Sequence, residues 1–272
     1  MPLGVTASVR LENTLRTVDS RNVVAKLAGS DLALTAEYVV YTAHWDHFGI
    51  GAAVNGDSIF NGAYDNATGV AGLLNVAQAF HTLKTAPKRS ILFLAVTAEE
   101  QGLLGSQYYG MTPIYPLKKT LANINMDQLN VLGPTRDLTV VGLGASDLDD
   151  VAQAAAAEQG RVLRPDPGPE GGGYYRSDHF SFARVGVPAL NPGEGIDYIG
   201  QADGYGSKMR ARFTVVDYHQ PSDEIRPYWD LSGGVLDLAL YMTVGYRVAN
   251  ATTFPQWRVG NEFRAIREQS MK

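Results

Sequence analysis

The chain has 272 residues, of which 45% are hydrophobic and 19% are charged, as expected for a globular protein with a sizeable core. The formal net charge of −5 at pH 7 argues against a surface that coats nucleic acid. The sequence has no cysteine, so disulfides are excluded and histidine and carboxylate side chains must hold any metal.

The N-terminal part of the chain predicts short strands. Residues 5–11 alternate apolar and polar side chains, which is typical of a half-buried strand, and residues 22–27 predict a second one. Residues 38–43, Y-V-V-Y-T-A, predict a buried strand, and a glycine-rich loop is expected to follow at residues 49–56. No apolar run approaches the ~18–20 residues that span a bilayer, and no signal peptide is visible.

A strand–helix–strand unit follows. Residues 67–83 predict a helix that is apolar on most sides, and the run from Ile91 to Val96 predicts another strand buried on both faces. Together with the strand at 38–43 they make a βαβ unit, in which parallel pairing is expected.

The second half of the chain continues the alternation of strands and helices. Without internal repeats or a low-complexity linker, it favours one domain, a three-layer α/β/α sandwich around a central, mostly parallel twisted sheet. The predicted elements are a helix from about Gly102, strands at 121–126 and 138–141, a helix at 147–159, a surface loop at 165–173, a short helix capped by Ser177, a strand at 187–190, a long loop at 191–212 and a helix at about 230–250.

Two adjacent carboxylates, Glu99 and Glu100, follow the strand at 91–96. Ligands gather at the carboxyl ends of strands in open α/β sheets, so one carboxylate could hold a metal while the other moves a proton. The alternative is that both residues simply open a helix, where its dipole favours negative charge.

Further candidate ligands lie at other predicted strand ends and in loops. A cleft holding many bare carboxylates would be strongly repulsive without cations, and imidazole with carboxylate suits a divalent metal. Two ions about 3.5–4 Å apart need a shared carboxylate, which Asp65 could provide. The candidates, besides Glu99 and Glu100, are His44, Asp46, His47, Asp65, Asp127 and His219.

Each candidate also has a structural interpretation. His44 could be a buried structural imidazole, Asp65 a turn residue or helix cap, and Asp127 the end of a strand. His47 is interpreted as structural or as a support for a ligand, and His179 as part of the pocket wall.

Six motifs in this order resemble the signature series of the di-zinc aminopeptidases and carboxypeptidases that include bacterial leucyl aminopeptidases and glutamate carboxypeptidase II. The resemblance spans about residues 20–250. The motifs are A-H-W-D-H, N-G-A-Y-D-N-A-T-G, E-E-Q-G-L-L-G-S, N-I-N-M-D, R-S-D-H-F-S-F and Y-H-Q-P-S-D.

The resemblance implies a role for each matched residue. One zinc would be held by His44, Asp65 and Asp127, and the other by Asp65, Glu100 and His219. Two Zn²⁺ ions are therefore expected, with Co²⁺ or Mn²⁺ as possible substitutes.

The resemblance also implies residues that act beside the metals. Glu99 would be the general base, and Asp46 would orient His44. Tyr218 and Tyr174 both resemble tyrosines that stabilise the oxyanion in relatives, and Asp178 is expected to hydrogen-bond substrate or a ligand.

The predicted function is a metal-dependent exopeptidase, an aminopeptidase that acts on a peptide with a free terminus. Its substrate pocket is expected from loops 165–176 and 191–212, and a carboxypeptidase stays open. The alternatives are a glutaminyl cyclase with one metal and a non-catalytic receptor module on the same fold. The resemblance also suggests that residues 1–272 are one catalytic domain of a longer, secreted or periplasmic protein, without an upstream protease-associated domain.

Overall fold

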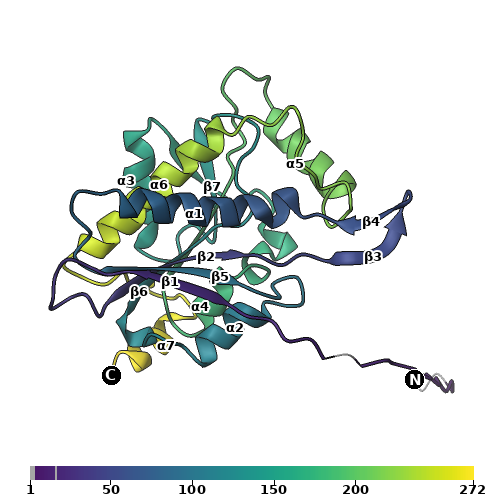
Figure 1. The fold of residues 1–272 in the computed structure, drawn as a ribbon, viewed down its shortest axis with the longest axis horizontal. Helices are drawn as coiled ribbons and strands as arrows, with labels where there is room; N and C mark the ends of the chain where they lie inside the picture. Colours follow the sequence, from purple (N-terminus) through teal and green to yellow (C-terminus); the bar gives the residue numbers. More distant parts are fainter. Residues whose placement is uncertain (1–3, 16) are drawn as a thin grey trace.

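A seven-stranded mixed sheet forms the middle layer of the protein, seen here in a computed structural model that describes residues 4–15 and 17–272 (Figure 1). Four of the neighbouring strand pairs are parallel, and β1–β5 and β7–β9 are antiparallel. The predicted mostly parallel sheet is therefore confirmed. The strands, in spatial order, are β1 (Val23–Leu27), β5 (Ser90–Val96), β2 (Tyr38–His44), β6 (Thr120–Asn125), β9 (Ala189–Gly193), β7 (Asp137–Val141) and β8 (Val162–Pro165).

The three central strands are the apolar runs that the sequence singled out. All residues of β2 and β6 are buried, as are all but one of β5, because helices cover both faces of this part of the sheet. In the β2–β5 pair, Tyr38 lies opposite Ser90 and His44 opposite Val96. This register brings the residues that follow both strands to the same edge.

Helices cover the sheet on both faces (Figure 1). On one face lie α1 (Thr68–His81), α3 (Leu148–Glu158) and α6 (Ser232–Asn250), and on the other lie α2 (Leu104–Met111), α4 (His179–Arg184) and α7 (Arg264–Ser270). The larger core packs α1, α3 and α6 against the sheet, and a smaller core lies under α2 and α4. The predicted three-layer sandwich is thus the observed fold.

Two predictions in the N-terminal part are wrong. Residues 5–11 form no strand and are exposed, with Val5 at 80% and Val9 at 79%, because no neighbouring strand pairs with them. The expected glycine-rich loop is a hairpin of β3 (Gly49–Val54) and β4 (Asp57–Phe60). Its two-residue turn, Asn55-Gly56, has positive φ at both positions. An Asn-Gly pair is the strongest short-range sequence signal for a hairpin.

The late part of the chain contains elements that the sequence did not reveal. The predicted loop at 191–212 runs into α5 (Tyr205–Val216), in which only Gly206 is buried, so its sequence lacks a clear apolar period. Strand β8 and helix α7 were also missed. The surface loop at 165–173 contains short 3₁₀ turns at Pro169–Gly171 and Gly173–Tyr175.

No helix among residues 4–15 and 17–272 combines the length and the apolar character needed to cross a bilayer.

The contact between α6 and β2 gives a testable prediction. A Cβ atom at Gly245 would lie 1.8 Å from the hydroxyl of Tyr41, which donates a buried hydrogen bond to the Tyr241 carbonyl. Gly245→Ala should lower the free energy of unfolding by about 1–3 kcal/mol through overpacking, although alanine normally favours a helix. Urea unfolding measures the change, with the exposed Val235→Ala on the same helix as a control. A Gly245→Ala protein as stable as the parent would contradict this packing.

Candidate metal centre

The carboxyl ends of three neighbouring parallel strands bring together acidic and imidazole side chains. His44 is the last residue of β2, Glu99 and Glu100 follow β5, and Asp127 follows β6. Because β2 lies between β5 and β6 and pairs with both in parallel, these side chains meet at one edge of the sheet.

Asp65 and His219 complete the cluster from two other segments. Asp65 lies in the turn Ala63–Ala67 that opens α1, and His219 follows α5. The Nε2 atom of His44 is 3.2 Å from Asp65 Oδ1, and Nε2 of His219 is 3.5 Å from Asp65 Oδ2. Each oxygen of Asp65 therefore faces a different histidine.

Each of the two histidines also lies close to a second carboxylate. His44 Nε2 lies 3.5 Å from Asp127 Oδ1, and His219 Nε2 lies 3.1 Å from Glu100 Oε2. The structure thus forms two groups that share Asp65, one with His44 and Asp127 and one with His219 and Glu100. These are the residues that the sequence grouped.

The charges in the cluster call for a cation. Asp65 is only 4% exposed, and among the described residues its only ion-pair partners are the two histidines. Burial would lower the pKa of His44, but the carboxylates of Asp127 and Asp65 close to its Nε2 atom raise it far above its usual value. Burial would raise the pKa of Asp65, and the bonds from His219 and His44 lower it below its usual range.

The donor set fits zinc. Donor atoms of His44, Asp65 and Glu100, and also those of His44, Glu99 and Asp127, lie within 4.8 Å of one another. The buried Asp127 Oδ1 has no hydrogen-bond partner among the described residues. Imidazole nitrogen and carboxylate oxygen are zinc ligands, and an ion would also reduce the repulsion between these carboxylates.

Glu99 lies beside the first group and carries a perturbed carboxyl. Burial, and then the negative charge of Asp127, raise its pKa to about 9. Without a cation this carboxyl holds its proton near neutral pH, whereas a positive charge beside it would favour the carboxylate that a general base requires.

Asp46 acts through both its backbone and its side chain. The Nδ1 atom of His44 is 3.1 Å from the Asp46 carbonyl oxygen but 3.9 Å from the carboxylate. The carboxylate accepts the backbone N–H groups of Glu99 (3.1 Å) and Glu100 (3.3 Å). Asp46 therefore holds the His44 ring through its carbonyl and the loop after β5 through its carboxylate.

Two polar contacts hold carboxylates of the cluster. The one from His47 agrees with its interpretation as a support for a ligand, and the one from Ser177 was not predicted. His47 Nδ1 lies 2.6 Å from Glu100 Oε1 and so fixes the oxygen that faces away from His219. Ser177 donates to Asp127 Oδ2 at 2.6 Å and accepts from Asn125 at 2.8 Å. The prediction that Ser177 caps a helix is wrong, because Asp178 occupies the N-cap position of α4.

The two tyrosine candidates lie in different surroundings. Tyr218 lines the pocket and stacks on His219 at a ring distance of 3.7 Å, and burial together with nearby carboxylates raises its pKa to about 12. Tyr174 packs instead among Trp257, Phe263 and Phe180, with its buried hydroxyl unpaired among the described residues. The structure therefore places Tyr218, and not Tyr174, beside the cluster.

Asp178 and His179 are buried below the cluster and do not line the pocket. Asp178 is 1% exposed, and burial raises its pKa to about 7. His179 is fully buried against the Tyr174 ring, which corrects the expectation that it forms part of the pocket wall.

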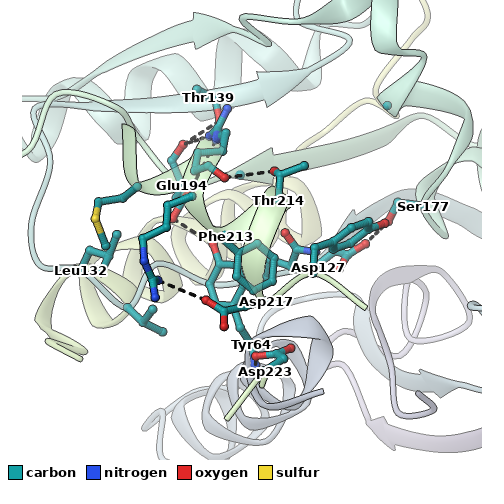
Figure 2. Close-up of a pocket in the computed structure, with 18 of the residues that line it drawn as sticks. Tyr64, Asp127, Leu132, Thr139, Ser177, Glu194, Phe213, Thr214, Asp217 and Asp223 are labelled. Carbon is teal, nitrogen blue, oxygen red and sulfur yellow. Dashed lines mark hydrogen bonds and ion pairs between the residues drawn. The ribbon is translucent and has the colours of Figure 1, made fainter. Parts of the chain in front are cut away.

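A pocket of about 350 Å³ opens next to Asp127 and Tyr218 (Figure 2). Both predicted segments line it, 165–176 through Asp166 and Arg176 and 191–212 through Glu194 and Met209, although Met209 belongs to α5 and not to a loop. Other lining residues, such as Phe213, lie outside the two segments. Its apolar surface includes Tyr64 and Trp229, while the lining residue Arg210 pairs with Glu194 at 3.5 Å.

Comparison with known proteins identifies related sequences. The model of peptidase family M28 matches residues 22–243. A probable zinc metalloprotease of Pyrenophora tritici-repentis is 34% identical over 127 residues, and the aminopeptidase NAALADL1 of Mus musculus is 32% identical over 131 residues. These matches cover 44% and 46% of this chain but only 24% and 16% of the relatives.

Solved structures share the fold. BSAP, a zinc aminopeptidase from Bacillus subtilis, superposes with a TM-score of 0.62 at 22% identity, over 89% of this chain and 52% of that one. The LapA aminopeptidase of Legionella pneumophila gives a TM-score of 0.62 at 21% identity, over 85% and 55%. The chain spans about half the length of these proteins.

Burial of His179 predicts a pH dependence of stability. Its pKa is lowered to about 3 because burial disfavours the charged ring, whereas the unfolded residue titrates near 6.5. As the pH falls, the unfolded state therefore takes up the proton at a higher pH than the folded state does. The stability that the folded protein gains from a neutral His179 is present above pH 6.5 and is lost below it. Between pH 6.5 and 4 the metal-free protein should lose roughly 3 kcal/mol through this residue. Urea unfolding should show a flatter pH profile for His179→Phe, and identical profiles would contradict the prediction.

Proposed function

The chain belongs to peptidase family M28, a family of zinc metallopeptidases, and we propose that it acts as an exopeptidase of the aminopeptidase type. The observation that carries this proposal is the position of Asp65 between His44 and His219, with Glu99 beside the same cluster. The names of similar proteins, among them NAALADL1 and BSAP, support the choice of aminopeptidase.

The proposed site holds two zinc ions. His44, Asp65 and Asp127 would bind one, and Asp65, Glu100 and His219 would bind the other. Zinc bound there would polarise the substrate carbonyl and supply a water whose pKa is lowered to about 7. The receptor-module alternative is disfavoured because the ligand groups and Glu99 are all present in one cluster.

The residues of the chain then divide the work of hydrolysis. Glu99 takes the proton from the attacking water and passes it to the leaving amine. Its backbone N–H is held by Asp46, which keeps this loop in place. The Tyr218 hydroxyl is protonated near neutral pH, as any tyrosine is, and burial raises its pKa further, to about 12. It donates a hydrogen bond to the carbonyl oxygen as negative charge develops.

The pocket beside Asp127 would receive the terminal side chain of a peptide. A panel of aminoacyl and carboxy-terminal peptide substrates tests this assignment on the zinc-loaded protein. Release of the N-terminal residue is expected. Release of the C-terminal residue would indicate a carboxypeptidase, and formation of pyroglutamate with one metal per chain would indicate a glutaminyl cyclase.

Removal of the proposed base gives the first functional prediction. Glu99→Gln should keep its zinc content but lose about 10²–10⁴-fold in kcat, because the amide cannot accept the proton. Elemental analysis checks the metal, and steady-state hydrolysis checks the turnover. His44→Ala is the comparison, since it should lose zinc as well as activity. Retained turnover in Glu99→Gln would remove Glu99 as the base.

The two tyrosines give a second functional prediction. Tyr218→Phe should lower kcat by about 10²–10³-fold with little change in KM, because the lost hydrogen bond forms in the transition state. Tyr174→Phe is the matched control, and its kcat should stay near that of the parent because its hydroxyl lies in the aromatic cluster. The reverse result would assign the oxyanion contact to Tyr174.

A further inference from the structure

Asn66 connects the turn that carries Asp65 to the loop that carries Asp127. Its Nδ2 donates to the carbonyl of Met126 at 3.0 Å, and its Oδ1 accepts the N–H of Gln128 at 3.1 Å. The side chain of Asn66 therefore binds the backbone on both sides of Asp127. Asn66 is only 2% exposed, so water competes little for these bonds.

Neighbouring residues show that this contact is tight. Asn66 Oδ1 also accepts the N–H of Gly69 at 2.9 Å, and a Cβ at Gly69 would lie 2.1 Å from that oxygen. Gln128 adopts a φ of +60°, which a non-glycine residue keeps only when its surroundings hold it. Thr68 adds a bond by accepting the N–H of Leu129 at 3.0 Å.

Asp223 makes the corresponding connection to the segment that carries His219. Its two carboxylate oxygens accept the N–H groups of Tyr64 (2.9 Å) and Asp65 (3.0 Å), and its carbonyl accepts the N–H of Ala63 (3.1 Å). Asp223 follows His219 by four residues and is 2% exposed. The turn of Asp65 is thus tied to both of its partner segments by different side chains.

We propose that Asn66 and Asp223 are positioning residues for the metal centre. Asn66 sets the separation between Asp65 and Asp127, and Asp223 sets the separation between Asp65 and His219. The inference rests on the proposed function only in that zinc is the ion bound. Neither side chain is a ligand, and each acts on one half of the cluster through backbone hydrogen bonds.

The proposal predicts that the two residues affect different ions. Loss of Asn66 frees the loop of Asp127 relative to Asp65, so it should weaken the ion that His44, Asp65 and Asp127 hold. Loss of Asp223 frees the His219 segment, so it should weaken the ion that Asp65, Glu100 and His219 hold. Residues that orient metal ligands typically change affinity by about 10- to 100-fold.

The test is stepwise zinc binding to the full chain, measured against buffered free zinc with elemental analysis of the bound metal. Asp127→Asn and His219→Ala identify which binding step belongs to which ion. Asn66→Ala should weaken the step that Asp127→Asn affects by about 10- to 100-fold. Asp223→Ala should weaken the step that His219→Ala affects by a similar factor.

Asp149→Ala is the matched control for a purely structural effect. Asp149 is 7% exposed and accepts backbone N–H groups of Gly144 and Ser146, and within the described part of the chain its hydrogen bonds reach no segment that carries a ligand. It should lower the melting temperature while leaving both zinc affinities unchanged. If Asn66→Ala or Asp223→Ala lowers the melting temperature and leaves zinc affinity unchanged, the positioning role is wrong.

The outcomes separate this inference from the proposed function. If the parent binds two zinc ions and the variants shift the expected steps, positioning holds even when no peptide is cleaved. If the parent cleaves peptides but the variants bind zinc normally, the function stands and the inference fails. A change in KM alone for Asp223→Ala would assign that residue to substrate binding and overturn its positioning role. A parent chain that binds no zinc overturns both.

Discussion

The repulsion between carboxylates at one edge of the sheet is the constraint on which the site depends. Asp65, Glu99, Glu100 and Asp127 lie close together, and Asp65 is nearly excluded from water. Burial, and then the negative charge of Asp127, raise the pKa of Glu99, which reflects the cost of holding a further negative charge there. A bound cation removes this repulsion, and the relief contributes favourably to the free energy of metal binding.

The surrounding residues stabilise the cluster without neutralising it. Asp46 and Asp223 are anchored by backbone N–H groups, and Asn66 also binds backbone. Among the described residues, no lysine or arginine pairs with Asp65, whereas Arg210 pairs with Glu194 in the neighbouring pocket. A guanidinium in the cluster would have satisfied the carboxylates and removed their need for a cation. Hydrogen bonds between these side chains and the backbone fix the geometry, and none of them places a lysine or arginine against the ligand carboxylates.

Much of this arrangement could be predicted from the sequence because it follows from local patterns. The buried runs at 38–43 and 91–96 are apolar except for Thr42. His44 follows the first directly, and Glu99 and Glu100 follow the second after two residues. Parallel pairing then places these ends together. The position of His219 was also predicted, but from the resemblance of its motif and not from any local period.

The parts that the sequence missed depend on tertiary contacts. The strand pattern at residues 5–11 fails because no partner strand is present, and α5 has no apolar stripe because it buries only Gly206. Tyr174 precedes the motif R-S-D-H as expected, yet its ring turns into the cluster of Trp257 and Phe263. Sequence spacing places a residue near a site, but packing decides which way its side chain points.

The course of the chain after α5 links the substrate pocket to the metal centre. Phe213 in α5 contacts the Tyr64 ring at 4.7 Å in the pocket wall, and five residues later Tyr218 stacks on His219. Tyr64 itself precedes Asp65, and its backbone N–H is held by Asp223 (Figure 2). The pocket wall and the ligand cluster therefore share two short segments, 63–65 and 213–223. A side chain that filled the pocket would contact the same segments that hold Asp65 and His219, so the pocket and the candidate metal site depend on shared backbone.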